Sequence, residues 1–130
     1  MTFDAIGIAG SALTVHRKWL DSAADNVANI NTAKPTDGPA FRATYVQAVE
    51  GAGNSGVYVA GVAYGDAEGR LVHDPANPLA DAEGYVRMPD IDMGAQMGSL
   101  ILAQRGYQAN AGVVDRAKAT YEAALQIGKS

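Results

Sequence analysis

The stretch DAIGIAGSALTVHRKWLDSAADNVANI, residues 4–30, determines the fold that the sequence predicts. Apolar and small residues recur in it every seven positions, along two interleaved lines: Ile6, Leu13, Leu20 and Val27, and Ala9, His16, Ala23 and Ile30. This average spacing of about 3.5 residues keeps one face of an α-helix turned toward a partner helix. No proline interrupts the stretch. We therefore predict a long N-terminal helix that packs against another helix.

The other end of the chain, residues 91–128, repeats this pattern. Its two lines are Met93, Leu100, Tyr107, Val114 and Tyr121, and Met97, Gln104, Ala111, Lys118 and Leu125. Two long helices with matching lines most simply pair with each other, so we predict a coiled coil of the two arms. The residues expected to pack in it, or against neighbouring subunits, are Ile6, Leu13, Leu20, Val27, Ile30, Met97, Leu100, Tyr107, Val114, Tyr121 and Leu125.

The segment between the helices has a different composition. All five prolines lie between residues 35 and 89, and proline disrupts helix interiors. Residues 41–50, 57–64 and 69–72 are rich in β-formers and bounded by turn residues, so we expect short strands there. The prediction is an α+β, mainly α fold in three parts: an N-terminal helical arm (1–33), a small β-rich middle segment (34–90) and a long C-terminal helix (91–130).

The middle segment carries the charge of the chain. It holds four Lys and Arg residues against eight Asp and Glu residues, which accounts for the whole net charge of −4. The phrase Asp-Ala-Glu-Gly occurs twice, at 66–69 and 81–84, and this order of residues is ordinary turn chemistry. We expect a compact, exposed, acidic lobe between the helical arms.

Both predicted helices contain poor helix formers: Gly7, Gly10, Gly94, Gly98, Gly106 and Gly112. At about 1 kcal/mol each relative to alanine, they cost roughly 6 kcal/mol, comparable to the stability of a small domain. Some could instead lie at frayed helix ends. Apolar residues such as Ile8, Trp19 and Leu102 also lie away from the two lines. The helices are therefore expected to need neighbours that cover a second face.

Little in the sequence points to catalysis. The chain has no cysteine, and its two histidines, His16 and His73, could not form a closed zinc site alone. No nucleotide-binding loop, metalloprotease motif or serine-hydrolase motif is present. Asp90 and Asp92 precede the second helix, where an acidic side chain favours the helix N-terminus, so one of them is expected to be a cap. We predict neither an enzyme nor a cofactor.

The charge and hydropathy patterns argue against two further classes of partner. A mildly acidic chain lacks the basic surface on which nucleic-acid binding depends. No apolar run approaches the ~20 residues that span a bilayer, so direct membrane insertion is not expected. The N-terminus has no basic segment ahead of its apolar part, so a cleaved signal peptide is not expected either.

The segment Asp25-Asn-Val-Ala-Asn-Ile-Asn-Thr32 holds three asparagines in six residues at the end of the first helix. Asparagine amides bond nearby backbone groups and tolerate left-handed geometry, so a helix terminus is one interpretation. Three amides in one turn exceed what a cap requires. Specific contacts to a neighbouring chain are the other interpretation.

At this segment the sequence resembles the bacterial flagellar axial proteins of the rod, hook and hook-associated structures. A Ser-Ala-Leu helix followed by Asn-x-Ala-Asn-x-Asn-Thr is matched by residues 11–13 and by Asn26, Ala28, Asn29, Asn31 and Thr32. Residues 38–42, 81–92 and 103–110 resemble segments of the proximal rod members of the basal-body rod family. The resemblance covers essentially the whole chain. Phe41, where a Tyr is commoner, and the weakly acidic stretch 93–97 depart from the pattern.

The resemblance implies a structural subunit of the proximal rod. Members of the family pack their paired terminal helices into a helical tube around the export channel, with the middle segment facing outward. The implied partners are other rod proteins, further copies of the chain and the flagellar type III export apparatus. The implied location is the periplasmic rod of the basal body, reached without a cleaved signal peptide. The alternatives are another flagellar axial subunit or a small secreted helical-hairpin adaptor, with an enzyme a distant third.

Overall fold

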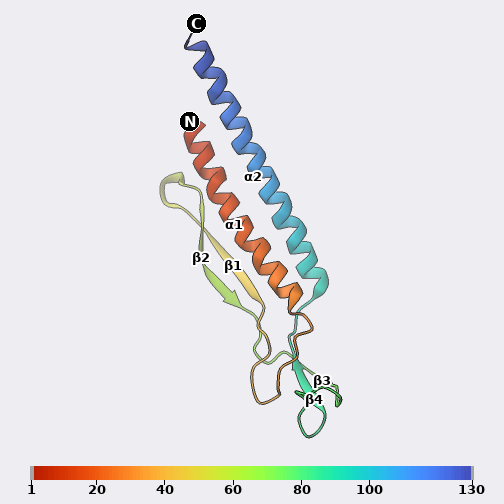
Figure 1. Cartoon of the computed structure of the whole chain (residues 1–130). Helices are drawn as coiled ribbons and strands as arrows, with labels where there is room; N and C mark the ends of the chain where they lie inside the picture. The colour runs from red at the N-terminus through yellow and green to blue at the C-terminus, as the bar shows by residue number, and fades with distance from the viewer. Residues whose placement is uncertain (1, 130) are drawn as a thin grey trace.

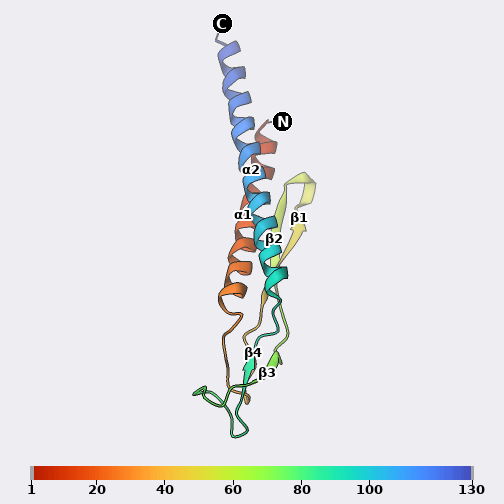
Figure 2. The same ribbon diagram turned by 90° about the vertical axis from the view of Figure 1, so that its right-hand side faces the viewer.

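The structure is a computed structural model that describes residues 2–129, with side chains from residue 4 onward. Two long helices dominate it: α1 (Thr2–Ala28) and α2 (Met93–Ile127). They lie side by side and antiparallel in both views (Figures 1 and 2), and both chain ends lie toward the same end of the elongated molecule. The long helices that the sequence predicted over residues 4–30 and 91–128 are confirmed, with each boundary within two residues. Met1 and Ser130, the outermost residues of the predicted arms, lie outside the described residues.

Asp92 caps α2 as the sequence predicted for one of the two aspartates. Its side chain accepts a hydrogen bond from the Gly94 N–H at 2.9 Å, while Asp92 itself keeps extended backbone geometry. This bond satisfies one of the backbone donors that the first helical turn leaves free. The helix therefore begins where the proline-marked middle segment ends.

The middle segment forms two separate two-stranded antiparallel sheets. In the first, β1 (Thr44–Glu50) pairs with β2 (Val57–Tyr64) through a connection that includes the short helix η1 (Ala52–Asn54). In the second, β3 (Arg70–His73) pairs with β4 (Tyr85–Met88). Three of the four strands match the prediction. The fourth, β4, was missed because its four residues carry no clear alternation and are held by pairing with β3.

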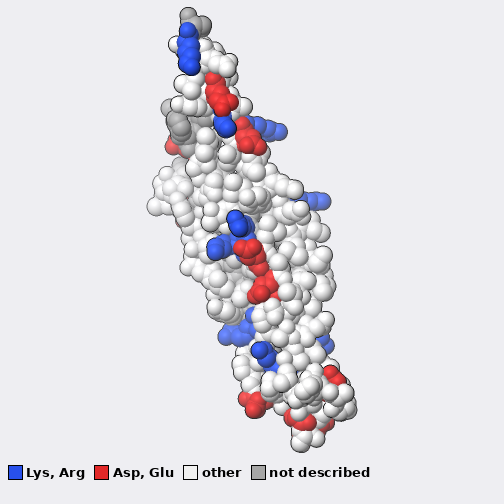
Figure 3. Space-filling model, in the orientation of Figure 1, with Lys and Arg blue, Asp and Glu red and all other residues white. Residues whose placement is uncertain are grey.

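The expected single acidic lobe is wrong. The β1–β2 hairpin lies along α1, and only β3–β4 lies beyond the helices, at the end of the molecule away from the termini (Figure 1). The hairpin packs on the helix because its strands are almost uncharged, whereas the acidic residues lie mainly in the turns around β3 and β4. Figure 3 shows several acidic side chains at that far end, with others along the helices.

The two Asp-Ala-Glu-Gly phrases form the turns that the sequence predicted. Asp66 Oδ1 accepts from the Glu68 N–H at 2.9 Å, and Asp81 Oδ1 accepts from the Glu83 N–H at 3.1 Å. Each turn ends on a glycine with positive φ, 61° at Gly69 and 84° at Gly84, a conformation that glycine adopts without strain. The repeated phrase is a repeated turn.

The buried core is thin. Its fully or nearly buried apolar side chains are mostly alanines: Ala9, Ala12, Val15, Ala23, Ala40, Ala43, Val86 and Ala103. The accessible surface is 8330 Å², against about 6,500 Å² for a compact monomer of this mass. The excess, about 1,800 Å², is comparable to the area buried in a standard protein–protein interface.

Candidate subunit interface

Asn26, in the last turn of α1, joins three elements of the fold. Its side-chain Oδ1 accepts from the Thr44 N–H, and its Nδ2 donates to the Thr44 carbonyl, each at 2.9 Å. Nδ2 also donates to Gln96 Oε1 on α2 at 3.0 Å. Asn26 is 1% exposed and Gln96 5% exposed, so the bond between them is buried, and the two bonds to Thr44 are partly buried. We call Asn26, Thr44 and Gln96 the junction, because they tie α1, β1 and α2 together.

Ser22, one turn earlier on α1, strengthens the junction. Its hydroxyl donates to the Thr44 carbonyl at 2.6 Å and lies 2.9 Å from the Thr44 hydroxyl. The outer edge of β1 at Thr44 is therefore paired with side chains of a helix instead of another strand. Buried polar groups are costly unless they are hydrogen-bonded, and here the donors and acceptors match.

The rest of the asparagine segment closes the helix end. Asn29 Nδ2 donates to the Asp25 carbonyl at 2.9 Å and to the Asp25 carboxylate at 3.2 Å, and the Thr32 hydroxyl donates to Asn29 Oδ1 at 3.0 Å. Ala28 and Asn31 are exposed. Asn29 and Thr32 thus serve the helix terminus, as the first interpretation expects. Asn26 bonds other elements of the same chain, and contacts of the segment with a neighbouring chain stay a prediction.

The helices approach closely at His16 and Gly106. The His16 Nδ1–H donates to the Ala12 carbonyl at 2.7 Å, which fixes the ring against α1. A Cβ atom built on Gly106 would overlap the His16 ring, so the glycine is what admits the histidine. Nearby, Ala103 is 0% exposed. Small residues on α2 therefore set the separation of the two helices.

The predicted α1 line faces this contact, but the α2 line does not. Ile6, Leu13, Leu20, Val27 and Ile30 are all half-buried, and the interleaved Ala9 and Ala23 are buried. On α2 only Leu100 and Val114 of the predicted packing residues are half-buried, whereas Met97, Tyr107, Tyr121 and Leu125 are exposed. The most buried line on α2 starts at Gln96 and Ala103, one residue earlier than the predicted line through Met97 and Gln104. Within the chain, the contact uses small and polar residues because these permit close approach, and the larger apolar residues face outward.

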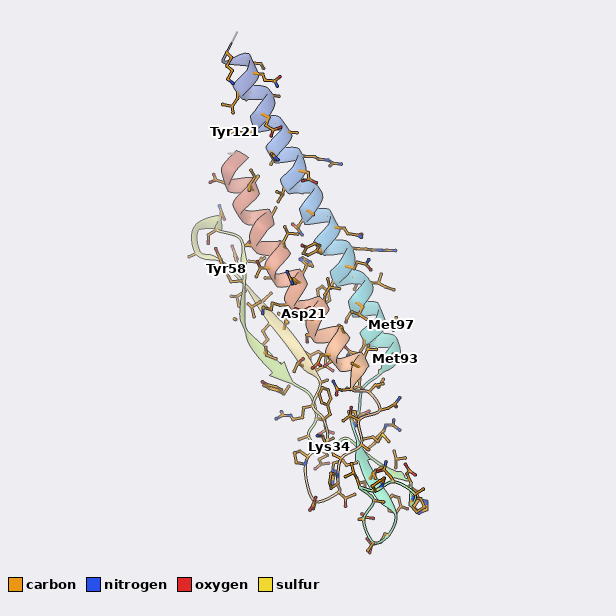
Figure 4. All side chains as sticks on the ribbon, viewed as in Figure 1. Asp21, Lys34, Tyr58, Met93, Met97 and Tyr121 are labelled. Carbon is orange, nitrogen blue, oxygen red and sulfur yellow. The ribbon has the colours of Figure 1, made fainter. Side chains whose placement is uncertain are left out.

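Those outward-facing apolar residues form an extensive surface on α2. Exposed large side chains on the helix include Met93, Met97, Ile101, Leu102, Tyr107, Val113 and Leu125. Met93, Met97 and Tyr121, labelled in Figure 4, follow the helix along its length. So many exposed large apolar side chains on one helix favour contacts of α2 with another molecule.

Other chemistry is sparse in the described part of the chain. No group of three or more potential metal ligands occurs there, and no helix is both long and apolar enough to cross a membrane. His73 packs edge-on against Tyr85, with ring centroids 5.0 Å apart. The pKa of Asp81 is lowered, chiefly because its carboxylate accepts a hydrogen bond from the Tyr85 N–H. These contacts are those of a folded turn region.

The partners of Asn26 in the junction carry no signal in the sequence. Thr44, Ser22 and Gln96 lie on three different elements, and only the fold brings them to Asn26. The contact of His16 with Gly106 was also missed. A glycine in the interior of a long helix can indicate that a neighbouring element approaches the helix closely. The indication is not specific, because a Cβ atom built on four of the six helix glycines, Gly7, Gly10, Gly98 and Gly112, would meet nothing within 4 Å.

Comparisons with known proteins agree with one another. A family model described as the C-terminal part of the flagellar basal body rod FlgEFG proteins matches residues 82–127. The flagellar basal-body rod protein FlgC of Escherichia coli O157:H7 is 42% identical, and that of Salmonella typhimurium 41% identical, each over 94% of both chains. The FlgC protein of Bacillus subtilis is 31% identical over 98% of both chains. These relatives match α1, the middle segment and α2 together.

Proposed function

The chain belongs to the FlgC family of flagellar basal-body rod proteins, and from this premise we propose that it assembles helically through α1 and α2 into the proximal rod. It is a structural subunit of the rod, in a family that is not one of enzymes. The observation that carries the function is the match to FlgC proteins over nearly the full length of the chain. Its location is the flagellar basal body.

The apolar surface of α2 supports assembly through the helices. A subunit with about 1,800 Å² more surface than a compact monomer can bury that excess against neighbours. In the assembled rod the two helices would pair with each other as a coiled coil and pack against neighbouring subunits. The packing residues would be Met97, Leu100, Tyr107, Val114, Tyr121 and Leu125 on α2 and the α1 line from Ile6 to Ile30.

Assembly is coupled to ordering of the helices in this proposal. The helix glycines lower the intrinsic stability of α1 and α2 by roughly 6 kcal/mol, so neighbours that bury a second apolar face would complete the folding. The free subunit is expected to show weak amide protection over residues 1–30 and 95–128. Strong protection there at micromolar concentration would contradict the coupling.

The proposed partners are other rod proteins and further copies of this chain. The chain would reach the periplasm through the flagellar type III export apparatus, without a cleaved signal peptide, and the middle segment (34–90) would face outward from the helical arms (1–33 and 91–130). An intact N-terminus, by mass spectrometry of the chain recovered from basal bodies, is the expected result.

The direct test is deletion of the gene, scored by electron microscopy of the basal bodies that the cells still build. Loss of rod, hook and filament with the membrane ring retained is the expected outcome. Intact flagella would overturn the proposal and favour a soluble adaptor instead.

Charged substitutions in the packing lines provide a second test. Leu13→Asp and Tyr107→Asp should each abolish assembly while leaving secretion intact, because a charge in an apolar subunit contact has no partner. Secretion is measured in the culture medium and assembly by electron microscopy. Equal loss of secretion would assign these residues to export or folding.

A further inference from the structure

The β3–β4 sheet is joined to the rest of the molecule through a narrow region that we call the neck. The sheet lies beyond the ends of the helices (Figure 1), and β3 and β4 contact mainly each other, whereas β1 and β2 both pack against α1. The neck consists of three chain segments: residues 29–43 lead from α1 to β1, residues 65–69 from β2 to β3, and residues 89–92 from β4 to α2. The position of the sheet therefore depends on how these segments are held together.

Backbone hydrogen bonds join the parts of the neck two at a time. The Ala40 N–H donates to the Ala67 carbonyl at 2.8 Å, which joins the first segment to the second. Lys34 and Arg87 bond each other's backbone in both directions, each at 2.8 Å, which joins the first segment to β4. Each of these contacts leaves the remaining part of the neck free to turn.

The side chain of Arg87 connects β4 to the first and second segments at once. Its Nη1 donates to the Glu68 carbonyl at 2.6 Å, and its Nη2 donates to the Thr36 carbonyl at 3.0 Å. A guanidinium is planar and holds its donors in a rigid fork, so the two bonds fix the direction of both carbonyls relative to β4. The same sheet holds Thr36 a second time, because the Thr36 hydroxyl donates to the Asp81 carboxylate at 2.9 Å.

The contact uses the directed bonds of Arg87 and not its charge. Among the described residues no carboxylate forms an ion pair with Arg87, and its Nε is buried without a hydrogen-bond partner. The residue is half-buried, and a charge removed from water without an opposite charge beside it costs free energy. The unbonded Nε–H adds to this cost. An arginine in such surroundings is better suited to fixing the geometry of the neck than to stabilising the fold.

We propose that Arg87 is a positioning residue, whose guanidinium sets the orientation of the β3–β4 sheet relative to the β1–β2 hairpin. Without the fork the sheet stays folded, because Val86 is buried in it and the backbone pairing of β3 with β4 needs no arginine side chain. The sheet then turns at the neck, where only pairwise contacts remain. The acidic turns around β3 and β4 move with it. The inference is independent of the proposed function, since it concerns the folded chain alone.

The experiment uses the purified full-length chain, which has no cysteine, so two cysteines can be introduced to carry spin labels. Gln47→Cys lies on β1 and Glu83→Cys lies in the turn before β4, and both residues are exposed. Double electron–electron resonance should give one narrow distribution of distances between the two labels. Arg87→Lys keeps the charge but loses the fork, so it should widen this distribution at least about twofold. An unchanged distribution would overturn the proposal.

Arg70→Lys is the matched control, because Arg70 lies on β3 of the same sheet and is exposed. This variant should leave the distribution unchanged, and an equal widening in both variants would overturn the proposal. Amide hydrogen exchange at Val72 and Val86, which pair with each other across the sheet, reports whether the sheet is folded. Both amides should stay protected in Arg87→Lys. Loss of their protection would show that Arg87 holds the sheet together instead of orienting it, which would also overturn the proposal.

A measurement on the unmodified chain decides the matter if circular dichroism shows that Arg87→Lys does not fold. The two Nη groups of Arg87 bond different carbonyls, so rotation about the Cζ–Nε bond would have to break both bonds. Nuclear magnetic resonance of the folded chain should therefore give two separate Nη signals for Arg87. A single averaged signal would mean that the fork is not held, and it would overturn the proposal.

Discussion

The two ends of the helix pair differ in how their polar and apolar groups are satisfied. At one end, Asn26, Thr44 and Gln96 form a buried junction whose bonds all lie within the chain. At the other end, α2 continues beyond α1 (Figure 1). Asn26 meets Gln96 and His16 meets Gly106, so the same one-for-one register places Thr2 level with about residue 120. Every residue from 118 to 129 is exposed.

This difference separates what the chain builds alone from what it leaves to its neighbours. The junction resembles the interior of any small domain: its groups are buried and paired. The overhanging part of α2, residues 121–127, carries apolar side chains that are exposed in the described part of the chain. In the folded chain, one end of the helix pair therefore has its polar groups paired internally, and the other end is suited to contacts with other subunits.

The largest effect on the isolated chain is expected from Asn26→Ala. The substitution leaves the Thr44 N–H and carbonyl and the Gln96 amide without their partner, and buried unpaired groups are expensive. Urea unfolding of the purified chain should show a loss of about 3 kcal/mol. Asn31→Ala, at an exposed asparagine of the same segment, should change stability by less than about 0.5 kcal/mol. Equal effects of the two substitutions would mean that the junction does not stabilise the fold.

The second effect in size concerns two glycines of α2. Gly106→Ala forces a methyl group into the His16 ring, so the chain should lose about 1–2 kcal/mol despite the better helix propensity of alanine. Gly98→Ala is the control, because a Cβ there meets nothing within 4 Å, and it should gain up to about 1 kcal/mol. Thermal unfolding of both variants gives the comparison. If Gly106→Ala also stabilised the chain, the helices would not approach each other closely at this point.

Residue patterns were sufficient to predict some elements and insufficient for others. The helices and the strand over residues 57–64 follow from local periodicity and from the placement of proline, so they were predicted closely. The predicted packing line on α2 lies one residue away from the observed one, because apolar periodicity marks the largest apolar side chains. The contact itself is made by Ala103 and Gly106, whose small size matters more than their hydropathy. The junction could not be predicted, because a polar network depends on which elements the fold brings together.

A substitution in the overhanging part of α2 should affect assembly and leave the stability of the isolated chain nearly unchanged, in contrast to a substitution in the junction. Leu125→Asp changes a residue that is 48% exposed, so the unfolding free energy of the isolated chain should move by less than about 0.5 kcal/mol. Assembly should nevertheless fail, since the charge would be buried against a neighbour without a partner. Motility in soft agar and electron microscopy of basal bodies measure this outcome. Normal assembly would show that the exposed end of α2 lies outside the subunit contacts.

The smallest change in unfolding free energy is expected from a substitution of Asp81. This residue is hydrogen-bonded, like the residues of the junction, but it lies at the surface. Its carboxylate accepts from the Tyr85 N–H at 2.8 Å and from the Thr36 hydroxyl at 2.9 Å, and the first of these bonds is the main reason that the pKa of Asp81 is lowered. A carboxyl whose pKa is lower in the folded chain than in the unfolded chain stabilises the fold above its unfolded pKa. That contribution is lost as the pH falls through the folded pKa.

The pH dependence of Asp81→Asn therefore tests whether satisfied bonds matter equally at the surface and in the junction. The difference in unfolding free energy between the unmodified chain and Asp81→Asn should be constant from about pH 7 to pH 5 and should shrink below about pH 4. Urea titrations across this range measure it. A difference that persists at low pH would mean that the charge of Asp81 contributes nothing and that the geometry of the turn alone holds Thr36 to the β3–β4 sheet. In that case burial, more than hydrogen bonding itself, would be what distinguishes the junction from the rest of the molecule.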